Sequence, residues 1–345
     1  MKKLLAVLLT VFMVFGLVAC SNNTTTDEPV NTPTTTDTTD STNELTVGLG
    51  SVTSVKNTEA TEDAAAKTQY NTTYALVVLN ADGTIAQVKV DVAQNTISFE
   101  GEVATETPTK YEKKEAYGMQ PASSLEKGEW YQQIEAFEAW CVGKTVADIT
   151  GAEVAVQGNG HGDSPVDLAT SCTMSTGDFV AAIEKAAANA VSANGATTFG
   201  VSSVTSLKLT PATDDATAKT QADTTMSVVG LDGETVKVVI TDVAQNKSSL
   251  DENGAPVGEP APTKLEKQYD YGMAGASSLE KGEWFEQIAA YNAWCVDKTV
   301  ADITGAEVAV QGNGHGDSPV DLATSCTMST GDFTAALVKA AAVAK

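Results

Sequence analysis

The sequence predicts an α+β fold made of two homologous domains, each an antiparallel sheet packed with helices, after a disordered tether. The block from Lys144 to Phe179 returns letter for letter from Lys298 to Phe333 in a chain of 345 residues. In each copy of the repeat, stretches with the two-residue period of strands come before stretches with the helical period of about 3.6 residues. Strands followed by helices are typical of an α+β domain.

The first 44 residues are expected to lie outside the two domains. Residues 1–19 have the order of a secretory signal peptide, in which lysines precede an apolar run. The run ends on Leu17-Val-Ala-Cys20, which resembles the bacterial lipobox, whose cysteine is lipidated after cleavage. Residues 20–44 are polar and predict a disordered tether, because they cannot bury enough apolar surface to fold. We therefore expect Cys20 to anchor the protein on the extracytoplasmic face of the cell membrane; the alternative is a cleavage site with an incidental cysteine.

The repeat divides the rest of the chain into a first domain at residues 45–192 and a second domain at residues 193–345. Tyr117-Gly-Met119 returns as Tyr271-Gly-Met273 at the same spacing as the identical blocks. A unit that occurs twice predicts two domains of one fold.

Strands are expected at the start of each domain. In the first domain, residues 45–56, 70–79 and 84–92 are rich in β-branched and apolar residues. Ala81-Asp-Gly83 predicts the hairpin turn between the last two strands, and Asp232-Gly233 predicts its counterpart in the second domain.

A helix is expected after the sheet. It should begin at Ser123, because the spacing from Ser123 to Glu126 matches a capping box. Trp130, Ile134 and Phe137 then fall on one helical face. We expect this aromatic stripe to pack the helix on the sheet rather than to stack on a cofactor, and the second domain repeats the pattern.

The identical block comes next in each domain. In the first domain it predicts a turn at residues 145–149, a strand at residues 152–156 and a glycine-rich loop at residues 158–162. A last helix should follow, with Ser175 and Asp178 at the spacing of a capping box. Thr173 therefore lies at the entrance to this helix, where unpaired backbone N–H groups favour a phosphate.

The charge of the chain excludes one class of function and restricts another. A formal net charge of -24 without a single arginine argues against nucleic-acid binding, which depends on neutralising phosphates. The absence of arginine also removes the usual fork that holds a free nucleotide phosphate.

Metal binding and hydrolysis are the first alternatives for the identical block. Each domain has one histidine and two cysteines, without the closely spaced ligand pairs of structural zinc sites, so no metal site is expected. No Gly-x-Ser-x-Gly motif occurs, and no catalytic residue is assigned. We expect His161 and His315 to lie beside a ligand or in solvent rather than to act as general bases.

The third alternative comes from a resemblance. Asp167-x-x-Thr170-x-x-Thr173 resembles the motif of FMN-binding domains in which the last threonine is esterified to FMN phosphate by a flavin transferase. Asp321, Thr324 and Thr327 form the same pattern in the second domain. The chain departs from the family where Ser171 and Cys172 replace a glycine and a small residue.

The lipobox, the polar tether and both repeats together resemble the PplA-like family of flavinylated lipoproteins, which serve extracellular electron transfer in Gram-positive bacteria. The resemblance implies two covalent FMN groups, one on Thr173 and one on Thr327. It implies a membrane quinone-linked dehydrogenase as electron donor, ferric iron or other extracellular acceptors, and an electron carrier rather than a turnover enzyme. His161, Tyr117 or Met119 would border the flavin ring.

The remaining cysteines occur as one pair in each domain, Cys141 with Cys172 and Cys295 with Cys326. Outside the cytoplasm such pairs predict disulfides. Reduced, partly buried thiols are the alternative.

Two other functions remain open at the level of sequence. One is a surface lipoprotein whose duplicated blocks bind a ligand or partner without redox chemistry. The other is a flavin-dependent reductase that acts on one small molecule in its own pocket.

Overall fold

The fold is mixed α+β, with antiparallel sheets packed against helices, as the sequence predicts. The computed structural model of the chain describes residues 44–156, 162–309 and 316–345. Cys20, His161 and His315 lie outside the described residues.

The first repeat contains six strands and four α-helices among its described residues. Its strands are β1 (Thr46–Thr58), β2 (Lys67–Leu79), β3 (Ile85–Ser98), β4 (Val154–Val156), β5 (Asp163–Pro165) and β6 (Val191–Ser192). Its α-helices are α1 (Lys110–Lys113), α2 (Trp130–Cys141), α3 (Val146–Thr150) and α4 (Gly177–Ala188). Short 3-10 helices occupy Lys114–Tyr117, Gln120–Ala122 and Val166–Leu168.

The second repeat follows the same order. Its strands are β7 (Thr198–Thr210), β8 (Lys219–Asp232), β9 (Thr235–Leu250), β10 (Pro256–Gly258), β11 (Val308–Ala309) and β12 (Ser318–Pro319). Its α-helices are α5 (Lys264–Lys267), α6 (Trp284–Cys295), α7 (Val300–Thr304) and α8 (Gly331–Ala342). Its 3-10 helices are Gln268–Tyr271, Ala274–Ala276 and Val320–Leu322. Within the described part of the chain, no helix has both the length and the apolar character needed to cross a bilayer.

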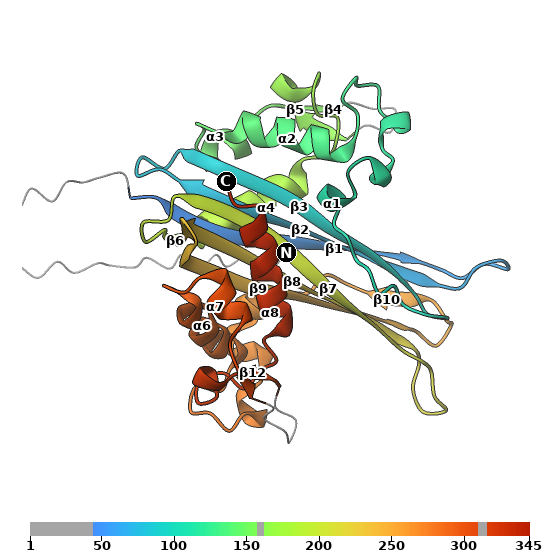
Figure 1. The fold of residues 1–345 in the computed structure, drawn as a ribbon. Coiled ribbons are helices and arrows are strands. Elements are labelled where there is room, and N and C mark those ends of the chain that lie inside the picture. The colour runs from blue at the N-terminus through green and yellow to red at the C-terminus, as the bar shows by residue number, and fades with distance from the viewer. Residues whose placement is uncertain (1–43, 157–161, 310–315) are drawn as a thin grey trace, which may run out of the picture. The chain divides into compact units, whose positions relative to one another are not determined.

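Each repeat builds one large antiparallel sheet from its three long strands. The first sheet has the order β3-β2-β1-β6 and the second the order β10-β9-β8-β7 (Figure 1). The hairpin between β2 and β3 turns at Gly83, whose φ of 82° suits glycine, and Asp82 accepts a hydrogen bond from the Thr84 N–H at 3.0 Å. The predicted hairpin is therefore confirmed.

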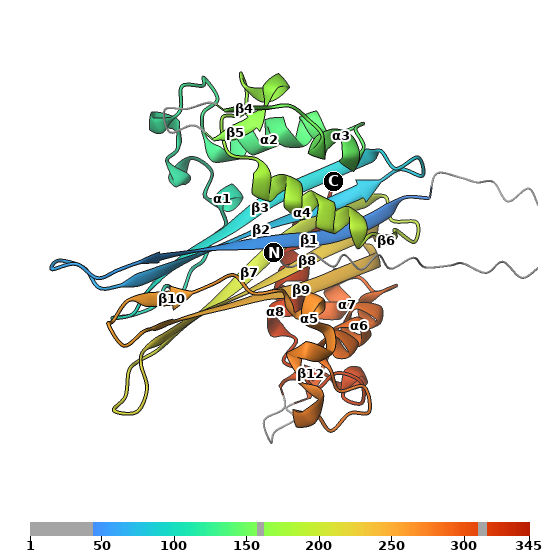
Figure 2. The ribbon, with the colours of Figure 1, turned by 180° about the vertical axis from the view of Figure 1, so that it is seen from behind.

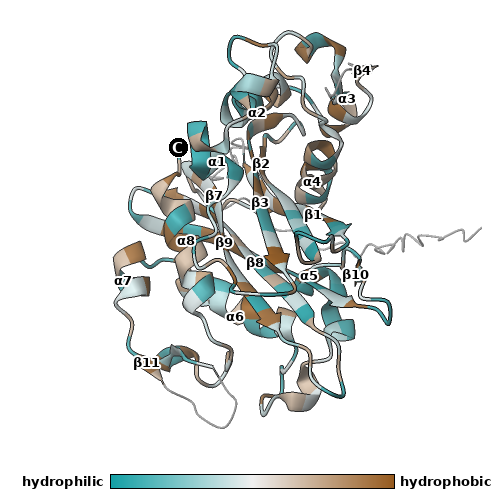
Figure 3. Cartoon of the chain, turned by 90° about the vertical axis from the view of Figure 1, so that its right-hand side faces the viewer, coloured by the Kyte–Doolittle hydropathy of each residue, from teal (hydrophilic) through white to brown (hydrophobic). Residues whose placement is uncertain are grey.

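Helices cover one face of each sheet. Trp130, Ile134 and Phe137 of α2 are buried against Val77 and Val90 of the first sheet, so the aromatic stripe packs the helix as predicted. In the views of Figures 2 and 3, α2 and α4 cover the first sheet, and α6 lies beside the second sheet.

Helix α4 approaches β1 closely because β1 carries glycines on that face. A Cβ added to Gly48 would lie 1.8 Å from the Ala186 carbonyl oxygen, and one added to Gly50 would lie 2.3 Å from the Ala186 nitrogen. Gly200 has the same relation to Ala340 of α8, with a distance of 2.1 Å. These strand positions therefore exclude any side chain that contains a Cβ unless the helix moves.

The other faces of the two sheets pack against each other. One apolar cluster contains Leu76 and Val78 of β2 together with Met226 and Val228 of β8. Hydrogen bonds accompany this contact: the Tyr74 hydroxyl accepts from Ser203 Oγ at 3.2 Å. The two repeats thus share a buried core in addition to the core that each forms with its own helices.

Several predicted element boundaries are wrong. Ser123 ends a 3-10 helix, and α2 begins at Trp130 with a capping box between Glu129 and Gln132. The expected turn at residues 145–149 is helix α3, which the Thr145 side chain caps. Serine and glutamate three residues apart satisfy the capping pattern without forming a cap when the intervening backbone leaves the helical region.

Candidate functional site

Thr173 lies in the short segment between the 3-10 helix at Val166–Leu168 and helix α4. The Cys172 N–H donates to the Leu168 carbonyl at 2.7 Å, and the Thr173 carbonyl accepts from the Gly162 N–H at 2.8 Å. The side chain is largely buried, with 7% of its surface exposed. Thr327 has the same contacts in the second repeat, and 8% of its surface is exposed. Both threonines are therefore held in a fixed backbone setting.

A glutamine on the preceding long helix holds each threonine. The Thr173 N–H donates to Gln133 Oε1 at 2.8 Å, and the Thr173 hydroxyl donates to the same oxygen at 3.3 Å. Gln133 is fully buried, and its Nε2 donates to the Gly128 carbonyl at 2.9 Å. Gln287 makes the equivalent bonds to Thr327 and Gly282. This glutamine is a positioning residue that sequence reasoning missed, although it recurs at the spacing of the repeat.

Glu129, at the start of α2, fixes the segment that carries Tyr117 and Met119. Its carboxylate accepts hydrogen bonds from the Met119 and Gln120 N–H groups, each at 3.0 Å. Glu283 accepts equivalent bonds in the second repeat. The start of α2 thus positions Thr173 through Gln133, and it positions the segment that carries Tyr117 and Met119 through Glu129.

A cleft lies between this segment, the sheet and the start of the last helix of each repeat. The first cleft has a volume of about 270 Å³, and its lining includes Asn71, Lys110, Tyr117, Met119, Trp130, Met174 and Ser175. The second cleft has a volume of about 260 Å³, and its lining includes Asp223, Lys264, Tyr271, Met273, Trp284, Met328 and Ser329. The residues directly after Thr173 and Thr327 therefore form part of a cleft wall in both repeats.

A lysine lies over the aromatic rings of each cleft. The Lys110 ammonium is 5.2 Å from the centre of the Tyr117 ring and 5.8 Å from that of Trp130. Lys264 has the same relation to Tyr271 and Trp284, at 5.0 and 5.5 Å. Lys267 also lies over Tyr271, at 6.0 Å from the ring centre. Each cleft thus combines aromatic surface and a lysine with a carboxylate, Asp178 or Asp332, and the aromatic surface is suited to a flat, electron-poor ligand.

Thr327 also borders a second hollow, of about 420 Å³, that adjoins the second cleft. This threonine hollow is lined by Gln287, Gly316 and Thr327, and it shares Met273, Met328 and Ser329 with the second cleft. A group attached to the Thr327 hydroxyl would therefore lie next to the aromatic cleft.

The other residues of the proposed motif lie elsewhere. Asp167 and Thr170 are exposed and do not line the first cleft, and the same holds for Asp321 and Thr324 relative to the second cleft. These four residues thus lie at the surface, outside the cleft linings.

The capping prediction for the last helix is also wrong. Helix α4 begins at Gly177 with Thr176 as N-cap, and no side chain caps it. Ser175 is exposed and lines the first cleft instead.

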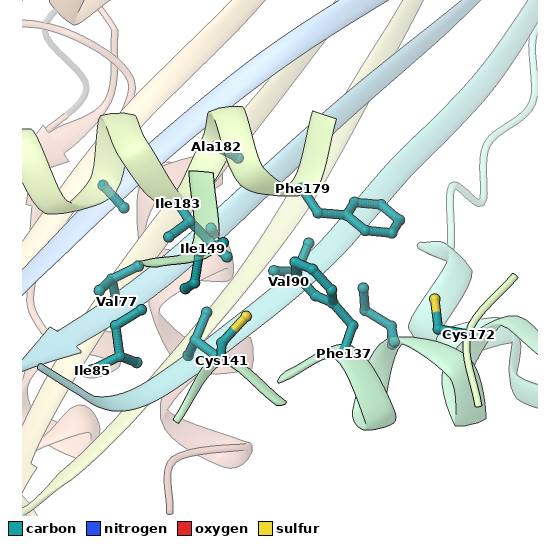
Figure 4. Close-up of a cluster of buried hydrophobic side chains, with 14 of the residues drawn as sticks. Val77, Ile85, Val90, Phe137, Cys141, Ile149, Cys172, Phe179, Ala182 and Ile183 are labelled. Atoms are coloured by element: carbon teal, nitrogen blue, oxygen red, sulfur yellow. The ribbon is translucent and has the colours of Figure 1, made fainter. Parts of the chain in front are cut away.

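Of the two alternatives given for the cysteines, the structure has the reduced thiols: Cys141, Cys172, Cys295 and Cys326 are free and buried. Cys141 packs near Ile85 and Ile149, and Cys172 lies at the other end of the same cluster (Figure 4). Burial raises the pKa of the Cys141 thiol to about 12 and that of Cys172 to about 11. The symmetry of the cysteines reflects a core that is packed twice in the same way, with each thiol acting as a small apolar group.

The described residues also bear on the metal expectation, but not on the histidine expectations. Among the described residues, no group of three histidine, cysteine or acidic side chains could hold a metal ion. The expectations for His161 and His315 stay predictions, since both lie outside those residues. Comparisons with protein-family models, with curated proteins and with solved structures found no match.

Proposed function

We propose that this chain is an electron carrier that holds one FMN on Thr173 and one on Thr327, each through a phosphoester of the threonine hydroxyl. The observation that supports the proposal most strongly is the same pairing in both repeats. A threonine fixed by a buried glutamine is followed directly by residues that line an aromatic cleft.

The residues of each cleft fit the flavin part of FMN. Tyr117, Trp130 and Met119 offer flat, polarisable surface, and Lys110 offers a donor to ring oxygens. Asn71 and Asp223 each have a buried Oδ1 with no hydrogen-bond partner among the described residues. Such an oxygen can accept the hydrogen bond that the N–H of a flavin ring donates, which would remove the cost of leaving it unpaired.

A covalent bond also fits the composition of the chain. Without arginine, and with a net charge of -24, the protein has little means to retain a phosphate by charge alone. An ester to Thr173 would replace the hydroxyl hydrogen bond to Gln133, but the bond from the Thr173 N–H would still hold the backbone in place. When bound, FMN supplies one- and two-electron transfer, and the protein supplies attachment, orientation and the local charge.

The setting of this activity follows from the N-terminal segment and the family resemblance. Lipidation at Cys20 would attach the protein to the outer side of the cell membrane, and residues 20–44 would give it reach. A membrane quinone-linked dehydrogenase would act as donor and ferric iron or other extracellular acceptors would be reduced. A flavin transferase would be needed for maturation.

Intact mass after co-expression with a flavin transferase tests the proposal. We expect two FMN increments in the unaltered protein, one in Thr173→Ala or Thr327→Ala, and none in the double variant. Thr150→Ala is the matched control, because Thr150 is an exposed threonine whose hydroxyl bonds only to its own helix, and it should keep both increments. A protein that stays free of flavin with a competent transferase would refute the proposal.

A further inference from the structure

The two clefts have nearly the same lining: Gln94 lines only the first cleft, and one matched position differs in residue type. Every residue that lines the second cleft has the same residue type at the matching position of the first, apart from Asp223, which corresponds to Asn71. Both sit at the same point of the central strand: Asn71 pairs with Ser54 and Gln94, and Asp223 pairs with Ser206 and Gln245. The two clefts therefore differ by one formal charge.

The hydrogen bonds around this position differ with the charge. The Asn71 Nδ2 donates to Ser54 Oγ at 3.4 Å. In the second repeat, Gln221 Nε2 donates to Asp223 Oδ2 at 2.6 Å, while the Ser206 hydroxyl donates to Asp332. The other oxygen, Oδ1, is buried without a partner in both repeats as far as the chain is described. An amide oxygen in one cleft is thus replaced by a carboxylate oxygen in the other.

We propose that this single difference gives the two flavin sites different reduction potentials, the Thr327 site being the harder to reduce, so that electrons pass from the Thr327 site to the Thr173 site. The proposal rests on the proposed function. Two-electron reduction of FMN at neutral pH adds two electrons and one proton, so the reduced ring carries one more negative charge than the oxidised ring. Transfer between the sites oxidises the second flavin and reduces the first, with no net change in electrons or protons.

The direction follows from the charges that line each cleft. Lys110 and Lys264 match in type and position, and so do Asp178 and Asp332, so the linings differ in formal charge only at Asp223. Lys267, 6.0 Å from the Tyr271 ring, lies outside the lining and has a lysine, Lys113, at the matching position of the first repeat. The Asp223 carboxylate has no counterpart of equal charge, and it repels the added charge of a reduced ring in the second cleft. A unit charge inside such a cleft is expected to change the reduction equilibrium by about tenfold, which corresponds to about 30 mV for a two-electron couple.

The test uses proteins that carry one flavin. Thr173→Ala keeps only the Thr327 site and Thr327→Ala only the Thr173 site. Spectroelectrochemical titration should give the Thr327 site the lower midpoint potential. Adding Asp223→Asn should raise that potential to the value of the Thr173 site, and adding Asn71→Asp should lower the potential of the Thr173 site by a similar amount. Asp270→Asn is the control, because Asp270 is exposed and does not line the cleft, so the shift should be much smaller.

The outcomes separate this inference from the function on which it rests. Equal potentials at the two sites, or a Thr327 site whose potential does not respond to Asp223→Asn, would refute the inference. The proposed function would still stand if the protein carried two FMN mass increments. A lower potential at the Thr173 site would reverse the proposed direction and refute it as well. Absence of FMN from both threonines would refute both the inference and the proposed function.

Discussion

At the scale of single residues, the site depends on a few polar groups whose roles come from their tertiary setting. The sequence alone pointed to Thr173, Tyr117 and Met119, because they recur in motifs with recognisable chemistry. It did not point to Gln133 or Asn71. Their types suit a solvent-facing helix or strand equally well. Only the packing of α2 and β2 shows that Gln133 is buried, and that Asn71 lines a cleft while its Oδ1 is buried.

Gln133→Ala should weaken attachment of FMN at Thr173 and leave Thr327 unchanged. The substitution leaves the Thr173 N–H and the Gly128 carbonyl without their partner in a buried setting, which costs about 1–3 kcal/mol of stability. Intact mass of Gln133→Ala, combined with urea unfolding, measures both effects. Gln287→Ala is the matched control and should affect only Thr327. Equal loss at both threonines in one single variant would argue against local positioning.

At the scale of elements, the order of strands and helices was predictable, while several boundaries were not. The period-two stretches became β1, β2 and β3, and the aromatic stripe became the buried face of α2. The capping patterns at Ser123 and Ser175 predicted the wrong helix starts, because the N-cap of α2 is Glu129 and the N-cap of α4 is Thr176. A residue caps a helix only where the backbone first takes helical φ and ψ angles. The spacing between two residues in the sequence does not determine that position.

A buried aspartate fastens the first helical turn of each repeat to its sheet. Asp242 on β9 accepts hydrogen bonds from the Leu265 N–H at 3.1 Å and from the Val243 N–H at 2.7 Å. Asp91 accepts from the Tyr111 N–H at 3.0 Å in the first repeat. Burial raises the pKa of Asp242 to about 6 from its ordinary value of 3.8.

This pKa predicts how stability depends on pH. Because the folded-state pKa of Asp242 is raised, its contribution to the free energy of unfolding is fully present below about pH 4 and is lost as the pH rises through about 6. Asp242→Asn keeps the Oδ1 acceptor and should remove this loss, on the order of 2 kcal/mol. Urea unfolding at about pH 4 and pH 7 measures it, with Asp270→Asn as an exposed control. Identical pH profiles for the wild type and Asp242→Asn would contradict the assignment.

At the scale of the whole molecule, the two repeats share a buried core that the repeat pattern in the sequence did not reveal. Tyr70 Oη lies 2.8 Å from Thr220 Oγ1, and Leu76 packs in the cluster that holds Met226. A signal was available in the sequence: the run Leu76-Val-Val78 is apolar at consecutive positions, which indicates a strand buried on both faces.

Reciprocal ion pairs join the repeats as well. Lys185 of α4 pairs with Glu266 of the second repeat, and Lys339 of α8 pairs with Glu112 of the first. Lys185 matches Lys339 in the repeat, and Glu112 matches Glu266, so each repeat gives one lysine and one glutamate to the contact. The contact therefore resembles the two-fold interface of a homodimer.

A single repeat should therefore not remain a monomer. Residues 44–192 expressed alone would expose Leu76, Val78 and their neighbours, which are fully buried between the sheets in the complete chain. We expect this fragment to form a dimer or larger species in light scattering, because its free face can pair with a second copy of itself. A folded, monomeric fragment would contradict the view that the shared core is needed.

The most direct test of the central proposal is the chemical state of two peptides from protein matured with a flavin transferase. Cleavage after lysine yields residues 145–185 and 299–339, which contain Thr173 and Thr327. The two peptides differ in mass because residues 180–184 differ from residues 334–338 at three positions. Tandem mass spectrometry should find one FMN increment in each peptide, located on Thr173 and on Thr327. Two unmodified peptides, or an increment located on any other residue, would contradict the account.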